Sequence, residues 1–161
     1  MSERHPPQWQ VMDAGHGGAE ADAMPLLIST TSLSTAGVLL IAVVLIEWGG
    51  YHVLSLTRGR RTATPFQLTF ARAGHAHAGV LVILALVAQL YVDAAGLTGL
   101  AEVAARQGLT LAAILMPAGF FLSSAGRDRT SPNALIWLLY AGAVSLGIGA
   151  VALGIGLLTA A

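Results

Sequence analysis

The fold is decided by the stretch ARAGHAHAGVLVILALVAQLYV, residues 71–92. Beyond Arg72 it contains no Lys, Arg, Asp or Glu, and it is long enough to cross a bilayer as a helix, which takes about 20 apolar residues. Two histidines, His75 and His77, interrupt its first half. An ionisable side chain within a membrane span is costly to insert and marks a candidate functional site. We therefore expect the chemistry of this protein at the two histidines.

The composition of the whole chain also indicates a membrane protein. Hydrophobic residues make up 55% of the 161 residues and charged residues 10%, whereas charged residues are about a quarter of a typical soluble domain. A backbone that crosses a bilayer must satisfy its own hydrogen bonds, which favours helices. The sequence predicts an all-α fold, an integral membrane four-helix bundle, with spans over about residues 23–54, 71–93, 106–126 and 131–158.

These spans leave little chain for anything else. Residues 1–22 are predicted to be a flexible polar tail, and residues 23–161 a single transmembrane domain. Within it, Ser131-Pro132-Asn133 is expected to start the fourth helix, because proline is well tolerated in a first turn.

The arginines predict the orientation in the membrane. Six of the eight basic residues fall in the first and third connections between spans, and positively charged connections face the cytoplasm. Both termini are then expected outside, with a bacterial inner membrane as the location. The formal net charge of zero makes a nucleic acid an unexpected partner, and the absence of cysteine excludes disulfides and thiolate ligands. The six arginines in the first and third connections are Arg58, Arg60, Arg61, Arg72, Arg127 and Arg129.

The spacing of the histidines limits how they could bind a metal. Side chains two residues apart on an α-helix point about 200° apart, so His75 and His77 cannot both bind one ion from the same helix. The neighbours of His77 are small, which leaves room for a broad, flat ligand such as a porphyrin, whose iron commonly takes an axial imidazole. The alternative is that the histidines only form hydrogen bonds to a neighbouring helix. The small neighbours of His77 are Ala73, Gly74, Ala78 and Gly79.

Two more polar residues of the first span fall at a similar depth. His52 and Glu47 could converge with the two histidines, either as supporting groups or as ligands of a non-haem zinc, copper or iron site. They could equally be polar groups at a helix end, beside Trp48 and Tyr51 in an aromatic belt.

Three motifs point to a known family. Ala71-Arg72-Ala73 followed by Ala76-His77-Ala78-Gly79 resembles the Ala-Arg-Ala-His-small-Gly motif that opens the second span of styrene oxide isomerases. Gly119-Phe120-Phe121-Leu122-Ser123 and Ser131-Pro132-Asn133 resemble that family's Gly-Phe-Tyr-Leu-Phe-Ser and Ser-Pro-Asn at the third and fourth spans. The hydroxylaminobenzene mutases are similar more distantly.

The resemblance implies a small oligomeric membrane protein, a trimer, that binds haem b. Ferric iron would act as a Lewis acid on an epoxide and yield an aldehyde without net redox change. His77 would be the axial ligand and catalytic residue, with His75 as the second choice because Gly74-His75 is an insertion relative to the motif. Arg72, Gly74 and Gly79 would then belong to the cofactor site.

Two departures from the family affect the substrate. Phe121 stands where the family has a tyrosine, and Ile83 where it has an asparagine, so the expected substrate pocket lacks two polar groups. A haem protein for electron transfer, sensing or haem handling is therefore a second hypothesis. A cofactor-free accessory subunit of a membrane complex is a third.

The fourth span is rich in small residues. Pairs four residues apart, such as Ser145 and Gly149, allow close approach of helices, either within one chain or between copies in a homo-oligomer.

Overall fold

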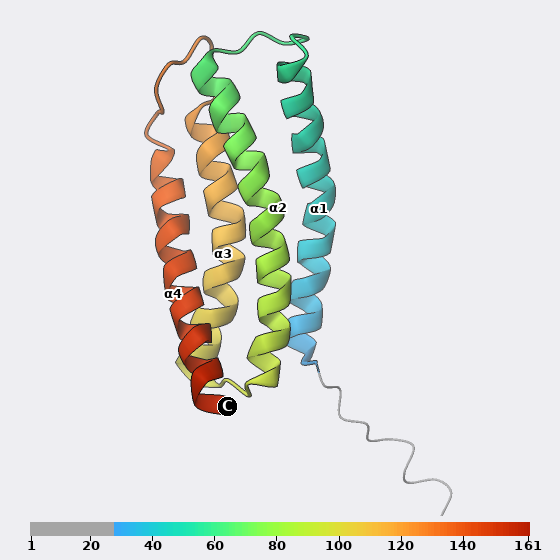
Figure 1. The fold of residues 1–161 in the computed structure, drawn as a ribbon, viewed down its shortest axis with the longest axis vertical. Coiled ribbons are helices and arrows are strands. Elements are labelled where there is room, and N and C mark those ends of the chain that lie inside the picture. The colour runs from blue at the N-terminus through green and yellow to red at the C-terminus, as the bar shows by residue number, and fades with distance from the viewer. Residues whose placement is uncertain (1–27) are drawn as a thin grey trace, which may run out of the picture.

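The computed structural model describes residues 28–161, and four helices account for most of them. They are α1 (Thr30–Thr57), α2 (Pro65–Ala94), α3 (Gly99–Ser123) and α4 (Ile136–Ala160). All four are long and apolar enough to cross a membrane, so the prediction of an all-α membrane bundle is confirmed. The helices alternate in direction, and α1 and α4 lie at opposite edges (Figure 1). The predicted tail at 1–22 lies outside the described residues.

The helix bounds differ from the predicted spans for local reasons. Helix α2 begins six residues earlier than the predicted 71, because Thr64 and Gln67 form a capping box and Pro65 occupies the first turn. Helix α1 begins at Thr30, where the Ser29 side chain accepts a hydrogen bond from the Ser32 amide.

The start predicted for the fourth helix is wrong. Ser131-Pro132-Asn133 belongs to the connection before α4, which begins only at Ile136. Asn133 holds this connection against the end of α3, since its Nδ2 donates to the carbonyl of Leu122 at 2.9 Å and its backbone amide donates to that of Ser123 at 2.9 Å. Asn133 thus joins the connection to the end of α3, and its Oδ1 also accepts from the Leu135 amide at 2.8 Å, in the turn that leads into α4.

Helices α3 and α4 pack closely because glycines face each other. A Cβ added at Gly108 would lie 2.8 Å from the Cα of Gly149, and one added at Gly119 would lie 2.4 Å from the amide nitrogen of Leu139. The hydroxyl of Ser145 also donates to the carbonyl of Gly108 at 2.8 Å. Glycine is therefore required at these positions to allow backbone contact. By contrast, Gly147 and Gly154 face open space.

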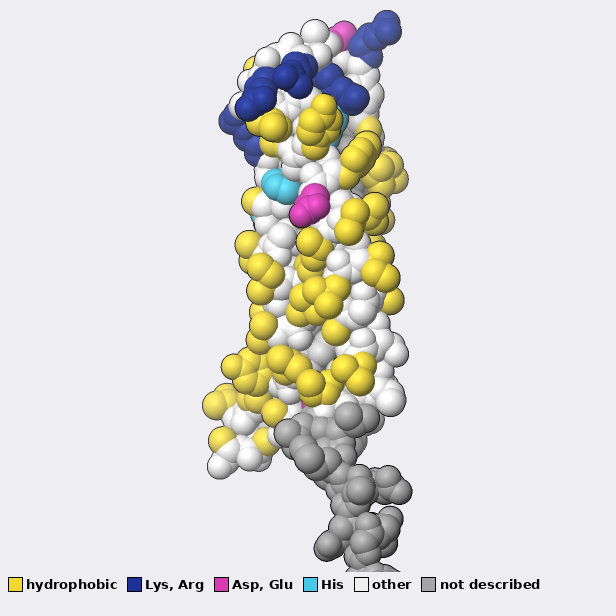
Figure 2. Space-filling view, turned by 90° about the vertical axis from the view of Figure 1, so that its right-hand side faces the viewer, with side chains coloured by type: hydrophobic (Ala, Val, Ile, Leu, Met, Phe, Trp, Pro, Cys, Tyr) yellow, Lys and Arg dark blue, Asp and Glu magenta, His cyan; other side chains and the backbone are white. Residues whose placement is uncertain are grey.

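Helix α1 is the least embedded of the four. It packs along its length only on α2, and large apolar side chains such as Val38, Ile41 and Leu45 are more than half exposed. The face of the bundle seen in Figure 2 is correspondingly covered with hydrophobic side chains, and basic side chains gather at one end. That end holds the connection from α1 to α2 and the connection from α3 to α4.

A buried polar cluster holds α1 at the opposite end of the bundle. Arg106 on α3 forms an ion pair with Asp93 on α2 and donates to the side chains of Gln89 and Ser32. The backbone amide of Ser29 donates to Asp93 Oδ2 at 2.9 Å, which brings in the start of α1. Three helices therefore meet at one guanidinium, and α1 is anchored to α3 only at its N-terminal end.

Candidate functional site: a cavity beside two histidines

A cavity of about 940 Å³ lies between α1 and α3, with α2 as its floor. It occurs in the half of the bundle remote from Arg106, where α1 makes no backbone approach to α3. Small side chains on the floor leave the space open, and Phe121 enters it from α3. The floor residues of α2 are Ala71, Ala78 and Val82, along with His75.

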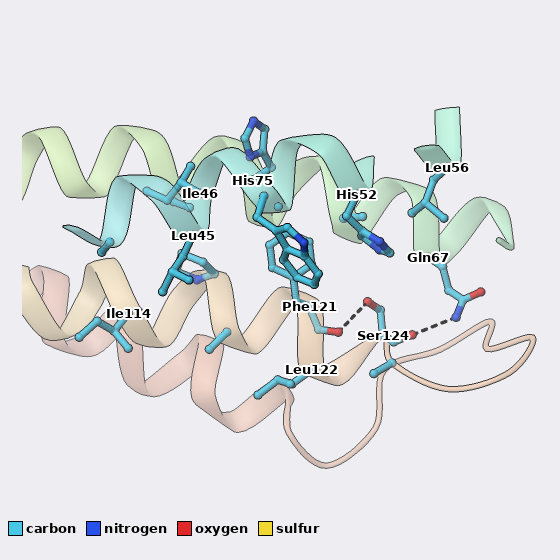
Figure 3. Close-up of a pocket in the computed structure, with 18 of the residues that line it drawn as sticks. Leu45, Ile46, His52, Leu56, Gln67, His75, Ile114, Phe121, Leu122 and Ser124 are labelled. Atoms are coloured by element: carbon cyan, nitrogen blue, oxygen red, sulfur yellow. Dashed lines mark hydrogen bonds between the residues drawn. The ribbon is translucent and has the colours of Figure 1, made fainter. Parts of the chain in front are cut away.

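The cavity changes in polarity along its length. Figure 3 shows Leu45, Ile46 and Ile114 towards one end, and His52, Gln67 and Ser124 towards the other. Arg61 and Thr62, from the connection after α1, complete the polar end.

The polar groups of Gln67 and Ser124 are already used within the protein. Gln67 Nε2 donates to the carbonyls of Ser124 at 3.0 Å and Gly126 at 2.8 Å, and its Oε1 accepts from the Thr64 amide. The Ser124 hydroxyl donates to the carbonyls of Phe120 and Phe121. These two residues therefore build the end wall.

His75 lies between α1 and α2 at the edge of the cavity. A Cβ added to Gly50 of α1 would lie 2.9 Å from Cε1 and 3.2 Å from Nε2 of the imidazole, so the ring fits only because residue 50 is a glycine. In Figure 3 the ring points away from His52 and Phe121. The Nδ1 atom is buried without a hydrogen-bond partner among the described residues. Nδ1 is therefore enclosed, whereas Nε2 makes no hydrogen bond in the described part of the chain, so the choice of His75 as the second candidate ligand stays a prediction.

His77 faces the other way, towards α3. Its ring lies against that of Phe120, with centroids 4.9 Å apart, and its Nδ1 is 2.8 Å from the carbonyl oxygen of Ala73. Because a carbonyl oxygen only accepts hydrogen bonds, Nδ1 must carry the proton of the neutral ring. Nε2 then has a free lone pair. Nε2 makes no hydrogen bond in the described part of the chain. This is the usual arrangement of a metal-binding histidine, in which the second nitrogen is held by a carbonyl.

The surroundings of the two histidines confirm that they occupy different faces of α2. His75 contacts α1 and lines the cavity, whereas His77 contacts α3 and does not line it. His77 is partly exposed, and a Cβ added at neighbouring Gly79 would meet nothing within 4 Å. Gly79 points about 200° away from His77, so it is the partial exposure of the His77 ring itself that leaves this face accessible from outside a single chain.

Several of the expected site residues lie elsewhere. Gly74 is buried under Phe120 and Phe121, with a Cβ clearance of 3.0 Å to each, so it serves the packing of α2 on α3 and is not part of a cofactor surface. Ile83 is 64% exposed and does not line this cavity, so its assignment to a substrate pocket stays a prediction. Phe121 does line it. Arg72 is exposed on α2.

The expected convergence of Glu47, His52, His75 and His77 is not found. Glu47 is exposed on α1 and is not among the residues that line the cavity, which His52 and His75 do line. Within residues 28–161, no group of three or more histidine and acidic side chains could hold a metal ion. The non-haem metal site is therefore unsupported by the arrangement of these residues.

Residues 28–154 match the model of a protein family described as a domain of unknown function, DUF8059. The chain belongs to this family. The DUF8059 match covers α1 to α3 and most of α4, so it includes the cavity, both histidines and the Arg106 cluster. No curated protein and no solved structure matches the chain.

Sequence analysis missed the Arg106 cluster. The available signal was the four-residue spacing of Gln89 and Asp93 on one helix and of Glu102 and Arg106 on the next. Such spacing places two polar side chains on one helix face. Polar pairs near the ends of consecutive spans therefore indicate a buried polar contact, provided that the two faces meet.

Proposed function

We propose that this chain is a membrane haem-b protein in which His77 supplies the axial ligand to the iron. The hydrogen bond from His77 Nδ1 to the Ala73 carbonyl carries the proposal, because it fixes the ring and leaves Nε2 free. The resemblance of the Ala71 to Gly79 segment to the haem-binding motif of styrene oxide isomerases supports the same residue.

The residues around His77 fit a flat macrocycle. Ala73, four residues before His77 and on the same face of α2, is small, and the Phe120 ring supports the imidazole on one side. The exposed guanidinium of Arg72 is available to a haem propionate. The His77 ring is partly exposed in one chain, and we propose that a second copy encloses the cofactor, in the homo-oligomer, a trimer, that the resemblance implies.

The reaction we propose is the isomerisation of a small hydrophobic epoxide to an aldehyde. Bound haem would supply a Lewis acid for the epoxide oxygen. The chain's own contribution is to hold the imidazole rigidly and to surround the substrate with apolar groups that keep water away. We also propose that both termini lie outside the cytoplasm, in a bacterial inner membrane.

The test is a visible absorption spectrum of detergent-purified protein expressed with a haem supply. Wild type and His75→Ala are expected to show a Soret band, and His77→Ala to lose it. His52→Ala is the matched control, since it removes another partly buried histidine of the same half of the bundle. Each variant is checked by size exclusion, so that loss of haem is separated from loss of fold. A Soret band that persists in His77→Ala, or no band in any sample, would overturn the proposal.

A haem protein without isomerase activity is a second candidate. The observation that favours it is the apolar character of the surroundings: Phe120 packs on His77, and the aliphatic Ile83 stands where the resembling family has a polar residue. A six-coordinate low-spin spectrum without epoxide turnover would select this candidate. An open iron position with epoxide turnover would select the isomerase. A protein without haem that purifies with stoichiometric partners would instead be an accessory subunit.

A further inference from the structure

We propose that the cavity between α1 and α3 binds an amphiphile that has a hydrocarbon chain and an anionic head, such as a carboxylate or a phosphate. Its volume, about 940 Å³, lies in the range of roughly 300–1,000 Å³ typical of ligand pockets. The site is separate from the surface at His77 that we assign to haem, because His77 does not line the cavity.

The apolar part of the cavity suits a hydrocarbon chain. From Leu39 to Leu56 the lining follows α1 for about 25 Å at a rise of 1.5 Å per residue. Most of the exposed lining is apolar, and from Leu39 to Ile46 the residues of α1 that line the cavity are all aliphatic. This part of the wall provides no side-chain hydrogen bond that would favour a polar ligand over a lipid chain.

The other end of the cavity suits an anion. Arg61 and His52 reach it, and none of the described residues that line the cavity is acidic. Gln67 and Ser124 are already hydrogen-bonded within the end wall, so they do not occupy the guanidinium or the imidazole. In the described part of the chain, Arg61 has no ion-pair partner and the His52 ring has no hydrogen bond. A carboxylate or phosphate would supply the missing acceptor.

The polar and apolar ends of the cavity are oriented as the head groups and chains of membrane lipids would be. Arg61 lies in the connection at the end of the bundle where the arginines gather, which is the position of lipid head groups. The apolar part runs from there towards the middle of the bundle, alongside exposed residues of α1. A ligand with its head at Arg61 and its chain beside Leu45 and Ile46 therefore has the same orientation as the surrounding lipid.

Nδ1 of His75 is a further polar atom, at the edge of the cavity between α1 and α2. It is buried and has no hydrogen-bond partner within residues 28–161, although buried ring nitrogens are normally satisfied. Because Nδ1 is enclosed, it is not part of the head-group site that we propose at Arg61 and His52.

The experiment measures binding of three probes to the purified full-length protein in detergent, by native mass spectrometry. The probes are palmitate, a lysophosphatidylglycerol with the same chain, and the neutral hexadecanol. We expect the anionic probes to bind at least about tenfold more tightly than hexadecanol, since hydrogen bonds to charged groups are the strong class. The anionic probe that binds more tightly indicates whether the site prefers a carboxylate or a phosphate head.

Four variants complete the test. Arg61→Gln is expected to weaken the anionic probes about tenfold and to leave hexadecanol unchanged, whereas Arg58→Gln, a neighbouring exposed arginine that does not line the cavity, retains wild-type binding. Ala42→Phe fills the apolar part and is expected to weaken all three probes. Val43→Phe is its matched control, because Val43 does not line the cavity.

Two outcomes would overturn the proposal. One is equal binding of hexadecanol and palmitate together with no effect of Arg61→Gln, which would indicate an unselective apolar groove. The other is displacement of the probes by haemin combined with loss of the Soret band in Ala42→Phe, which would place haem in this cavity. Probe binding is measured separately from the Soret band, so the amphiphile proposal and the haem proposal can each fail alone.

Discussion

Arg106 and Asp93 form a buried ion pair between α3 and α2, with 2.5 Å between Nη2 and Oδ1. Only 4% and 8% of their side-chain surfaces are exposed. Gln89 Oε1 accepts a further bond from the guanidinium at 3.1 Å, and Glu102 Oε1 accepts one at 3.0 Å. A charge inside a membrane protein is tolerated when it is paired in this way.

Removing the arginine of this pair is expected to destabilise the protein strongly. Arg106→Gln leaves Asp93 as an uncompensated buried charge, which costs about 3–5 kcal/mol of unfolding free energy. Thermal unfolding in detergent, followed by circular dichroism, measures the effect. Glu102→Gln is the matched control, because its side chain is 33% exposed and an exposed pair contributes about 1 kcal/mol or less. Equal losses in the two variants would contradict a central role for the pair of Arg106 and Asp93.

The contact between α3 and α4 predicts opposite effects for two glycines. Gly108→Ala places a Cβ 2.8 Å from the backbone of α4, and overpacking of this kind costs about 1–3 kcal/mol. Gly147→Ala meets open space in one chain and is expected to stabilise the helix by about 0.5–1 kcal/mol. Unfolding temperatures compare the two directly. If Gly147→Ala is the more damaging, that face of α4 must contact something outside the chain, and size exclusion would reveal a change of oligomer.

Gly50 and His75 are expected to be energetically coupled. Gly50→Ala would push its new Cβ against the imidazole, at 2.9 Å from Cε1, and cost about 1–3 kcal/mol. The same substitution in a His75→Ala background should cost little, because the ring it displaces is gone. A double-mutant cycle on unfolding free energy gives the coupling. Additive effects would show that the ring moves aside freely.

The absence of cysteine makes the predicted orientation simple to test. Arg60→Cys introduces a single thiol in the connection after α1, and Thr98→Cys introduces one in the connection after α2. With the basic connections in the cytoplasm, an impermeant maleimide added to intact cells should label Thr98→Cys and spare Arg60→Cys. The reverse pattern would invert the topology.

Apolar length and period were enough to predict the four helices, because a bilayer accepts few alternatives. The same helix geometry separated His75 from His77, and the structure places them against α1 and α3, respectively. What could not be predicted was which faces meet. The position of Ile83 outside the cavity, the burial of Gly74 under two phenylalanines and the meeting of Gln89, Asp93 and Arg106 all depend on how the helices rotate against one another. A single sequence does not determine that rotation.

The predicted start of the fourth helix was wrong for a related reason. Ser131-Pro132-Asn133 has the composition of a helix N-terminus, but the carbonyls at the end of α3 compete for Asn133. Asn133 Oδ1 still accepts from the Leu135 amide, so the local signal marks the turn into α4, and the helix itself begins three residues after Asn133.

Helix α1 is held to α3 at one end only, and along its length it packs on α2. Its hydrogen bonds to α3 gather around Ser29 and Ser32, and the rest of its length meets α3 only across the cavity. Beside the cavity no direct packing of α1 on α3 closes the space between them. A lipid-like molecule would therefore reach the cavity sideways from the bilayer, without passing through water.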